Sequence, residues 1–268
     1  QLSTIDLDRA SNLAKEAYKK FQEGDVKGAI EVLNEEALSK SLEEGKMEIT
    51  NIEQQLLKAD SVFYQSIENY MIKARFCILN RQYDEAFKNY EKGARADSTN
   101  LKNLMEWIEY TSQMNQDKEA IELLNKALKM AKNNPDRAKI LTSLGVEYST
   151  VNDYDNAKDA FMKSLGIFDG LIEKDPNEYE PDFAKVKREF GVMHKKLNNH
   201  FKAEELHLEA LDIQRVVAQN QLPESLNEVV KTLISLGGLY DYLFFYPQSE
   251  KALIEALKIN EKLIERNP

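Results

Sequence analysis

The chain has 268 residues, of which 42% are hydrophobic and 31% are charged, and glycine and proline are scarce. This composition favours long helices joined by short turns. A formal net charge of −10 excludes duplex nucleic acid as the main partner, and the single cysteine, Cys77, excludes an intrachain disulfide or a multi-cysteine metal site. No apolar run reaches the roughly 18 residues that a membrane span needs, so we expect no membrane insertion.

The first 100 residues contain two units of similar pattern. Residues 10–38 and 67–98 each place two alanines twelve positions apart, on either side of a short polar turn. Each unit therefore predicts two antiparallel helices, the first as a weak repeat 1 and the second as repeat 2. Residues 39–66 between them fit no repeat, and we expect them to add a helix or to extend a neighbouring one.

Four further units follow at residues 100–132, 136–176, 181–222 and 223–268. In the last three, Gly145, Gly191 and Gly237 recur every 46 residues, and a second small residue follows each glycine after twelve positions. Small residues at facing positions let two helix axes approach closely, which offsets a helix cost of about 1 kcal/mol for glycine. The turns predict a left-handed residue, which asparagine tolerates, at Asn80, Asn115, Asn152 and Asn198.

The 136–176 unit carries Leu144-Gly145, Tyr148, Tyr154, Ala157 and Phe161, and closes at Pro176. This pattern resembles the tetratricopeptide repeat (TPR) family, and the 46-residue spacing resembles its longer variant in kinesin light chains and many bacterial TPR proteins. The resemblance implies an all-α fold, a right-handed α-solenoid of about six stacked helix pairs. It also implies a non-catalytic scaffold without a cofactor, which binds a protein or peptide in a concave groove. The longer spacing requires longer helices or an inserted turn.

The same resemblance implies which residues face the groove. A ladder of lysines recurs at one position of successive first helices, and other candidates fall at neighbouring positions. The ladder is Lys102, Lys139, Lys185 and Lys231, and the other candidates are Arg75, Arg188, Lys195, Asp241 and Tyr242. A cationic groove would suit an acidic peptide or a C-terminal carboxylate. Solvated lysines near helix N-termini are the alternative explanation. The asparagine expected in the chaperone-binding branch of the family is absent.

Three histidines, His194, His200 and His207, fall in one repeat, at positions that the preceding repeat fills with aromatic residues. We expect neutral imidazoles in a partly exposed core and no metal. A metal site or an enzymatic role through these histidines is the remote alternative.

"LGGLY" (236–240) lacks the spacing and the preceding strand of a nucleotide loop, and Phe244 and Phe245 fall at an inter-helix turn. A regulatory or sensory segment of a larger signalling protein is an alternative function, with its effector domain beyond Pro268. The chain begins at Gln1, as signal-peptide cleavage or trimming would leave it. Of these we favour cleavage and an extracytoplasmic bacterial protein, with a cytoplasmic location as the alternative.

Overall fold

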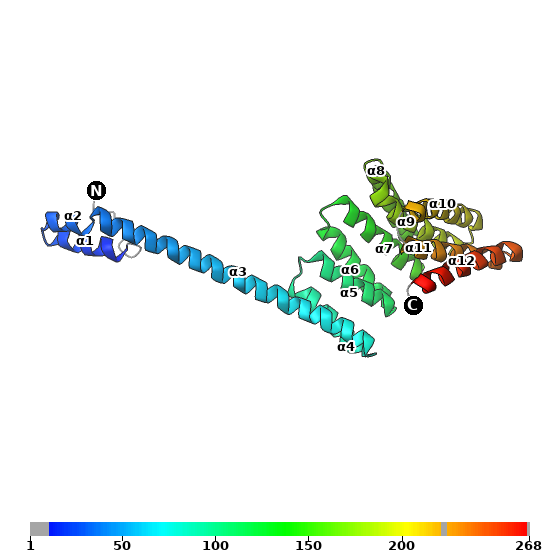
Figure 1. The fold of residues 1–268 in the computed structure, drawn as a ribbon, viewed down its shortest axis with the longest axis horizontal. Coiled ribbons are helices and arrows are strands. Elements are labelled where there is room, and N and C mark those ends of the chain that lie inside the picture. Colours follow the sequence, from blue (N-terminus) through cyan, green and yellow to red (C-terminus); the bar gives the residue numbers. More distant parts are fainter. Residues whose placement is uncertain (1–10, 221–223, 267–268) are drawn as a thin grey trace. The chain divides into compact units, whose positions relative to one another are not determined.

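The computed structural model describes residues 11–220 and 224–266, which form twelve helices and no strand (Figure 1). The all-α fold predicted from the sequence, a solenoid of antiparallel helix pairs, is confirmed. The chain divides into two compact units, Gln1–Glu68 and Asn69–Pro268. Over the described ranges no helix has the length and apolarity needed to cross a bilayer.

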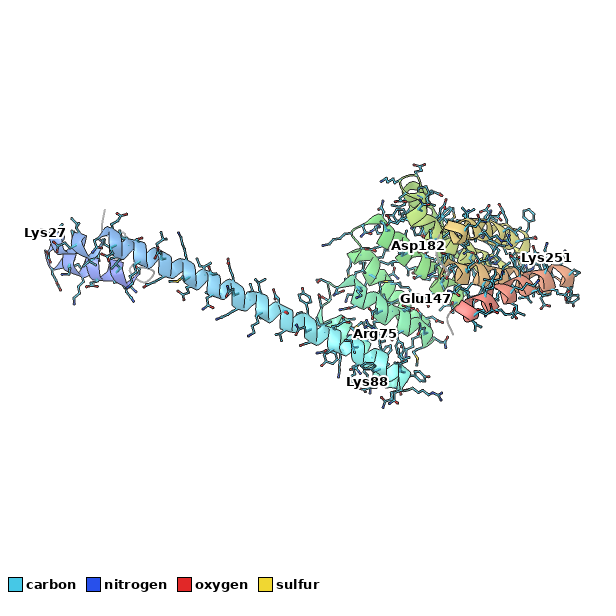
Figure 2. The ribbon with its side chains drawn as sticks, in the orientation of Figure 1. Lys27, Arg75, Lys88, Glu147, Asp182 and Lys251 are labelled. Atoms are coloured by element: carbon cyan, nitrogen blue, oxygen red, sulfur yellow. The ribbon has the colours of Figure 1, made fainter. Side chains whose placement is uncertain are left out.

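The N-terminal unit begins with a short helix pair, α1 (Asn12–Gln22) and α2 (Val26–Val32). The side chain of Asp25 caps α2 by accepting a hydrogen bond from the amide of Gly28 at 2.8 Å. The third helix, α3 (Glu35–Leu79), contains the whole 39–66 segment without a break. Along this segment the side chains are exposed to solvent on all sides of the helix (Figure 2).

In the C-terminal unit, the end of α3 packs on α4, and four further helix pairs follow. The bounds are α4 (Tyr83–Ala96), α5 (Leu101–Gln113), α6 (Asp117–Met130), α7 (Asn134–Thr150), α8 (Tyr154–Ile172), α9 (Pro176–Lys196), α10 (His200–Asn220), α11 (Glu224–Tyr242) and α12 (Tyr246–Arg266). The helices lengthen from 13 residues in α5 to 21 in α9 and α10. Longer helices therefore accommodate the 46-residue spacing.

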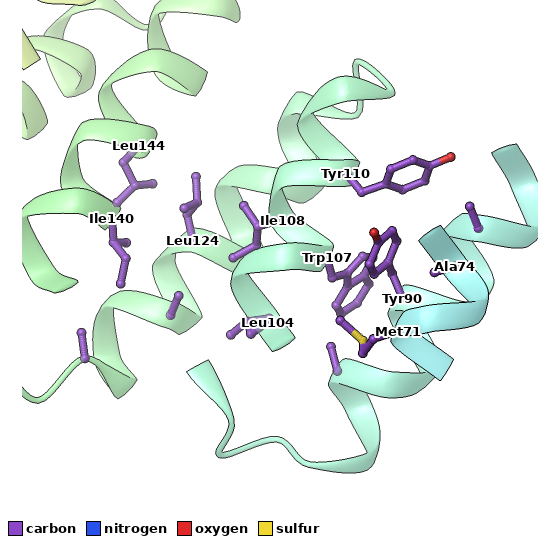
Figure 3. Close-up of a cluster of buried hydrophobic side chains, with 14 of the residues drawn as sticks. Met71, Ala74, Tyr90, Leu104, Trp107, Ile108, Tyr110, Leu124, Ile140 and Leu144 are labelled. Carbon is purple, nitrogen blue, oxygen red and sulfur yellow. The ribbon is translucent and has the colours of Figure 1, made fainter. Parts of the chain in front are cut away.

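The apolar core of this unit contains three clusters of buried residues, and the partly buried Tyr148 and Ile167 pack against both the first and the second. Trp107 and Tyr90 belong to the first, which also receives Met71 and Ala74 from the end of α3 (Figure 3). The second cluster is built around Phe161 and Phe168, and the third around Leu233 and Leu236. Each cluster joins neighbouring helices only, as expected where each helix pair contacts only the pairs beside it.

The recurring glycines mark close approaches between paired helices. A Cβ atom on Gly145 would lie 2.7 Å from the ring of Phe161 on α8, and one on Gly191 would lie 2.8 Å from the ring of His207 on α10. At Gly237 the same atom would lie 2.7 Å from Leu253 on α12. In each repeat the glycine thus makes room for a large side chain of the second helix.

A residue with positive φ ends the first helix of five successive pairs. Asn115, Asn152 and Asn198 take this conformation, as predicted. The prediction for Asn80 is wrong, because the positive φ of 59° falls one residue later, at Arg81. Phe244 completes the series at 61°, where a bulky side chain is unusual.

Replacing Phe244 with asparagine should raise the free energy of unfolding by about 1 kcal/mol, because asparagine tolerates the left-handed conformation at lower cost. Little packing would be lost, since Phe244 is 74% exposed. Urea denaturation followed by circular dichroism measures the change. Phe244→Ala is the matched control, because it removes the same exposed ring without the tolerance of asparagine for the left-handed conformation. A destabilised F244N would show that the ring contact with Tyr246 outweighs the backbone strain.

Candidate binding groove

A groove with a volume of about 690 Å³ lies across α5, α7 and α9. These are the first helices of three consecutive pairs, so the groove follows the inner face of the stack. Its lining combines apolar residues, including Ile108, Val146 and Phe168, with charged residues. Glu147 on α7 and Asp182 on α9 are two of these charged residues (Figure 2).

Three lysines of the predicted ladder, Lys102, Lys139 and Lys185, line this groove. The fourth, Lys231, is not among the lining residues, and its ammonium group pairs with Glu228 at 2.7 Å. Lys139 pairs with Asp182 across the groove at 2.9 Å. Within the described ranges, neither Lys102 nor Lys185 forms a salt bridge.

The lining contains more carboxylates than lysines, a balance that the lysine ladder alone did not indicate. Its five acidic residues are Glu106, Glu109, Glu147, Asp182 and Glu189. Arg75 forms a salt bridge with Glu106, with 2.7 Å between Nη2 and the carboxylate. Three lysines against five carboxylates give a groove of mixed and slightly negative charge.

Glu147 is the unusual member of this set, because only 7% of it is exposed. Burial raises its pKa, a hydrogen bond with Ser112 on α5 acts in the opposite direction, and the charge of Asp117 raises it further. No lysine or arginine of the described chain forms a salt bridge with it. A buried carboxylate without a cationic partner is costly, and a cation entering the groove would relieve that cost.

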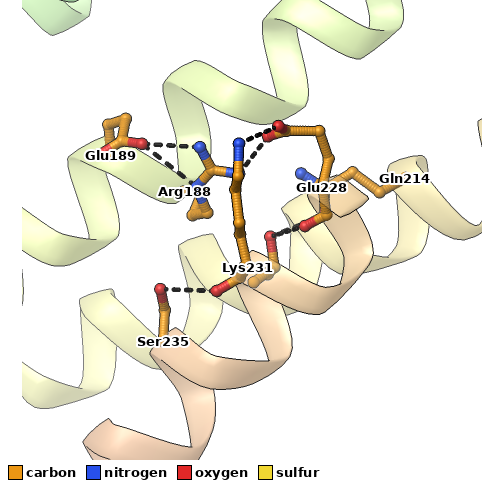
Figure 4. A network of polar contacts seen from close by, with 7 residues as sticks. Arg188, Glu189, Gln214, Glu228, Lys231 and Ser235 are labelled. Atoms are coloured by element: carbon orange, nitrogen blue, oxygen red, sulfur yellow. Dashed lines mark hydrogen bonds and ion pairs between the residues drawn. The ribbon is translucent and has the colours of Figure 1, made fainter. Parts of the chain in front are cut away.

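Arg188, expected to face a ligand, is instead held between α9 and α11. It is 5% exposed and its guanidinium contacts Glu189, at 2.8 Å from Nη2, and Glu228 (Figure 4). Glu228 also accepts a hydrogen bond from Lys231. Arg188 therefore joins two neighbouring repeats, and its hydrogen-bonding capacity is largely used within the protein.

The remaining predicted residues lie away from the groove. Lys195 donates a hydrogen bond to the carbonyl oxygen of Gly238 at 2.7 Å, which ties the end of α9 to α11. The hydroxyl of Tyr242 lies 3.3 Å from Asn198 Oδ1, and its ring packs on His200. Asp241 is exposed beside it. The structure does not bring these three residues together with the groove lysines.

The histidines are packed as aromatic rings. His207 is fully buried, and burial, followed by the charges of Arg188 and Lys195, lowers its pKa to about 4. His194 packs on Phe190 with 4.6 Å between ring centroids, and burial, then the charges of Lys202 and Lys158, lowers its pKa. In the described ranges, no three histidine, cysteine or acidic residues gather as metal ligands would.

Sequence reasoning found the groove lysines through their spacing but missed its acidic residues. Glu109 lies at the groove position where the chaperone-binding branch has asparagine, so its repeat position could have singled it out, whereas Glu147 has no such signal. Asp182 and Glu189 lie three residues before and four residues after Lys185, so a helical projection around each lysine could have placed both beside it.

Comparison with known proteins gives one family match and several structural neighbours. Residues 138–168 match the tetratricopeptide repeat model. The structure of BtubC from P. vanneervenii aligns with a TM-score of 0.59 and 16% identity, over 87% of this chain and 94% of that one. A kinesin light chain protein from Podospora anserina, with nearly identical TPR-like repeats, aligns with a TM-score of 0.56 and 18% identity, over 75% and 98%. No curated protein sequence matches the chain. At these identities the structural neighbours show a shared fold.

Proposed function

We propose that this tetratricopeptide-repeat protein is a scaffold that holds a segment of a partner protein in the groove across α5, α7 and α9. The repeat fold indicates a role in protein interaction, and the groove offers the concave face that such arrays use. A lining that combines apolar and charged residues suits a peptide that buries apolar side chains and forms ion pairs.

The charges in the groove favour a segment with both signs of charge. Glu147, buried and without a salt bridge in the described chain, would receive a lysine or arginine of the ligand. Lys102 and Lys185 would receive acidic side chains or a C-terminal carboxylate. The buried carboxylate of Glu147 is the observation that carries this proposal, because among the acidic lining residues it alone is buried and it forms no salt bridge within the described chain.

Replacing Glu147 with glutamine should weaken binding of such a segment by at least about tenfold, since a buried charge pair across an interface is worth more than about 1.4 kcal/mol. A random peptide library displayed on phage supplies the probe, and we expect selection to enrich peptides that contain a lysine or arginine. Dissociation constants of the selected peptides are then measured with purified protein by isothermal titration calorimetry.

Glu122→Gln is the matched control, because Glu122 is an exposed carboxylate on α6 outside the groove. A second variant, Ser143→Trp, places a bulky ring in the groove and should abolish binding of every selected peptide. Selected peptides that bind S143W as well as the native protein would contradict the proposed site. Peptides blocked by S143W but indifferent to E147Q would contradict only the role of Glu147.

A further inference from the structure

Among the described residues of the N-terminal unit, no helix packs on the segment of α3 from Leu38 to Ser66. Every residue in it is exposed, including ten large hydrophobic side chains with exposed fractions between 47% and 69%. An isolated helix gains little stability in water, and burying one such side chain contributes about 1.5–3 kcal/mol. The segment therefore has a strong driving force to bury one face.

Six of these ten side chains, together with Gly45 and Ala59, follow a coiled-coil spacing. Eight positions, separated alternately by four and three residues, form one stripe, which we call the α3 seam. The seam consists of Leu38, Leu42, Gly45, Ile49, Ile52, Leu56, Ala59 and Phe63. This alternation keeps one face of the helix towards a partner helix over its whole length. The seam lies within the N-terminal unit.

The sizes of the seam residues indicate what covers it. If a second copy of α3 runs antiparallel, one register places Ile49 opposite Ile52 of the second copy. In that same register Leu42 lies opposite Ala59, and Gly45 lies opposite Leu56. At each end of the pair, Phe63 of one copy lies opposite Leu38 of the other and forms the outermost layer. Large residues then face small ones, which keeps the packing dense. A parallel pair in register would place glycine on glycine and alanine on alanine, and would leave cavities at both layers.

The residues that flank the seam carry matching charges. In the antiparallel register, Lys46 of each copy lies beside Glu53 of the other, and Glu48 lies beside Gln55. In a parallel pair, Glu48 would lie beside Glu53 of the second copy, and the two carboxylates would repel each other. We infer that the chain forms a homodimer through an antiparallel coiled coil of the α3 seam. This interface is independent of the groove across α5, α7 and α9.

The association state of the full chain tests this inference. Sedimentation equilibrium at micromolar concentration should give a dimer. The double substitution Ile49→Glu with Ile52→Glu should weaken association by about a hundredfold or more, because it removes the central apolar layers. The matched control is Leu57→Glu, which replaces an exposed leucine outside the seam and should leave the dimer intact. Circular dichroism verifies that every variant keeps its folded repeats.

Disulfide cross-linking tests the direction of the helices. With buried Cys77 replaced by alanine, Gly45→Cys and Leu56→Cys variants are mixed, refolded together and oxidised. The antiparallel register should give the mixed cross-link, which joins the G45C variant to the L56C variant, and little of either homodimeric disulfide. A native chain that remains monomeric would overturn the inference. Homodimeric disulfides at both positions would overturn it as well, since they require the parallel arrangement.

Discussion

Replacing both acidic partners of Arg188, as Glu189→Gln with Glu228→Gln, should lower the free energy of unfolding by about 3–5 kcal/mol. The reason is that the guanidinium is 5% exposed and would remain buried without a compensating charge. Burial alone would raise the pKa of Glu228, but its contacts with Lys231 and Arg188 reverse this and lower it. The carboxylate is therefore ionised at neutral pH, and the substitution removes a full negative charge.

A third substitution separates the charge effect from simple loss of packing. In the double variant, Arg188→Met removes the stranded charge, and it should restore most of the lost stability, because a hydrophobic residue of similar length can replace a buried ion pair at little cost. Urea denaturation at neutral pH, followed by circular dichroism, measures all three proteins. A double variant that loses less than about 1 kcal/mol would show that solvent reaches Arg188.

Replacing His207 with phenylalanine should leave the protein at least as stable at pH 7 and more stable than the native chain in acid. The pKa of His207 is about 4 in the folded protein and near 6.5 when unfolded. Between these values the unfolded chain binds a proton that the folded chain does not bind. The native protein therefore loses about 1.4 kcal/mol per pH unit as the pH falls from 6.5 to 4, or about 3 kcal/mol in total.

The structure shows that a phenyl ring fits in the position of His207. Phe161 occupies the same slot against Gly145 that His207 occupies against Gly191, so a phenyl ring fits there. Among the described residues, neither ring nitrogen of His207 has a hydrogen-bond partner, which makes the imidazole costly even when neutral. The measurement is the difference in unfolding free energy between H207F and the native chain at each pH across this range. Taking the difference cancels the titration of the other groups, which both proteins share. A constant difference would show that His207 takes up its proton while folded.

The sequence was sufficient for the architecture because the signals for it are local and periodic. The constant spacing of Gly145, Gly191 and Gly237 predicts the helix pairs. The turns are predicted by Asn152 and Asn198. The groove was harder to predict, because its charges depend on pairs that the stacking brings together. Arg188 forms an ion pair with Glu228, which lies 40 residues later in the chain. Lys139 on α7 forms one with Asp182 on α9, the first helix of the next pair. Neither ion pair follows from a sequence pattern. A residue's position on the predicted inner face therefore did not show whether its charge was free to bind a ligand or already paired within the protein.

The division of the apolar core into three clusters, of which the first two are bridged by Tyr148 and Ile167, has a consequence for cooperativity. A single continuous core favours all-or-none unfolding, whereas an array joined only by nearest-neighbour interfaces can open from its ends, one repeat after another. Trp107, the only tryptophan, lies in the first cluster, while His207 and Arg188 belong to later repeats. The fluorescence of Trp107 reports on the repeats around α5, while circular dichroism averages over every helix. Separation of the two melting curves would measure how weakly the clusters are coupled.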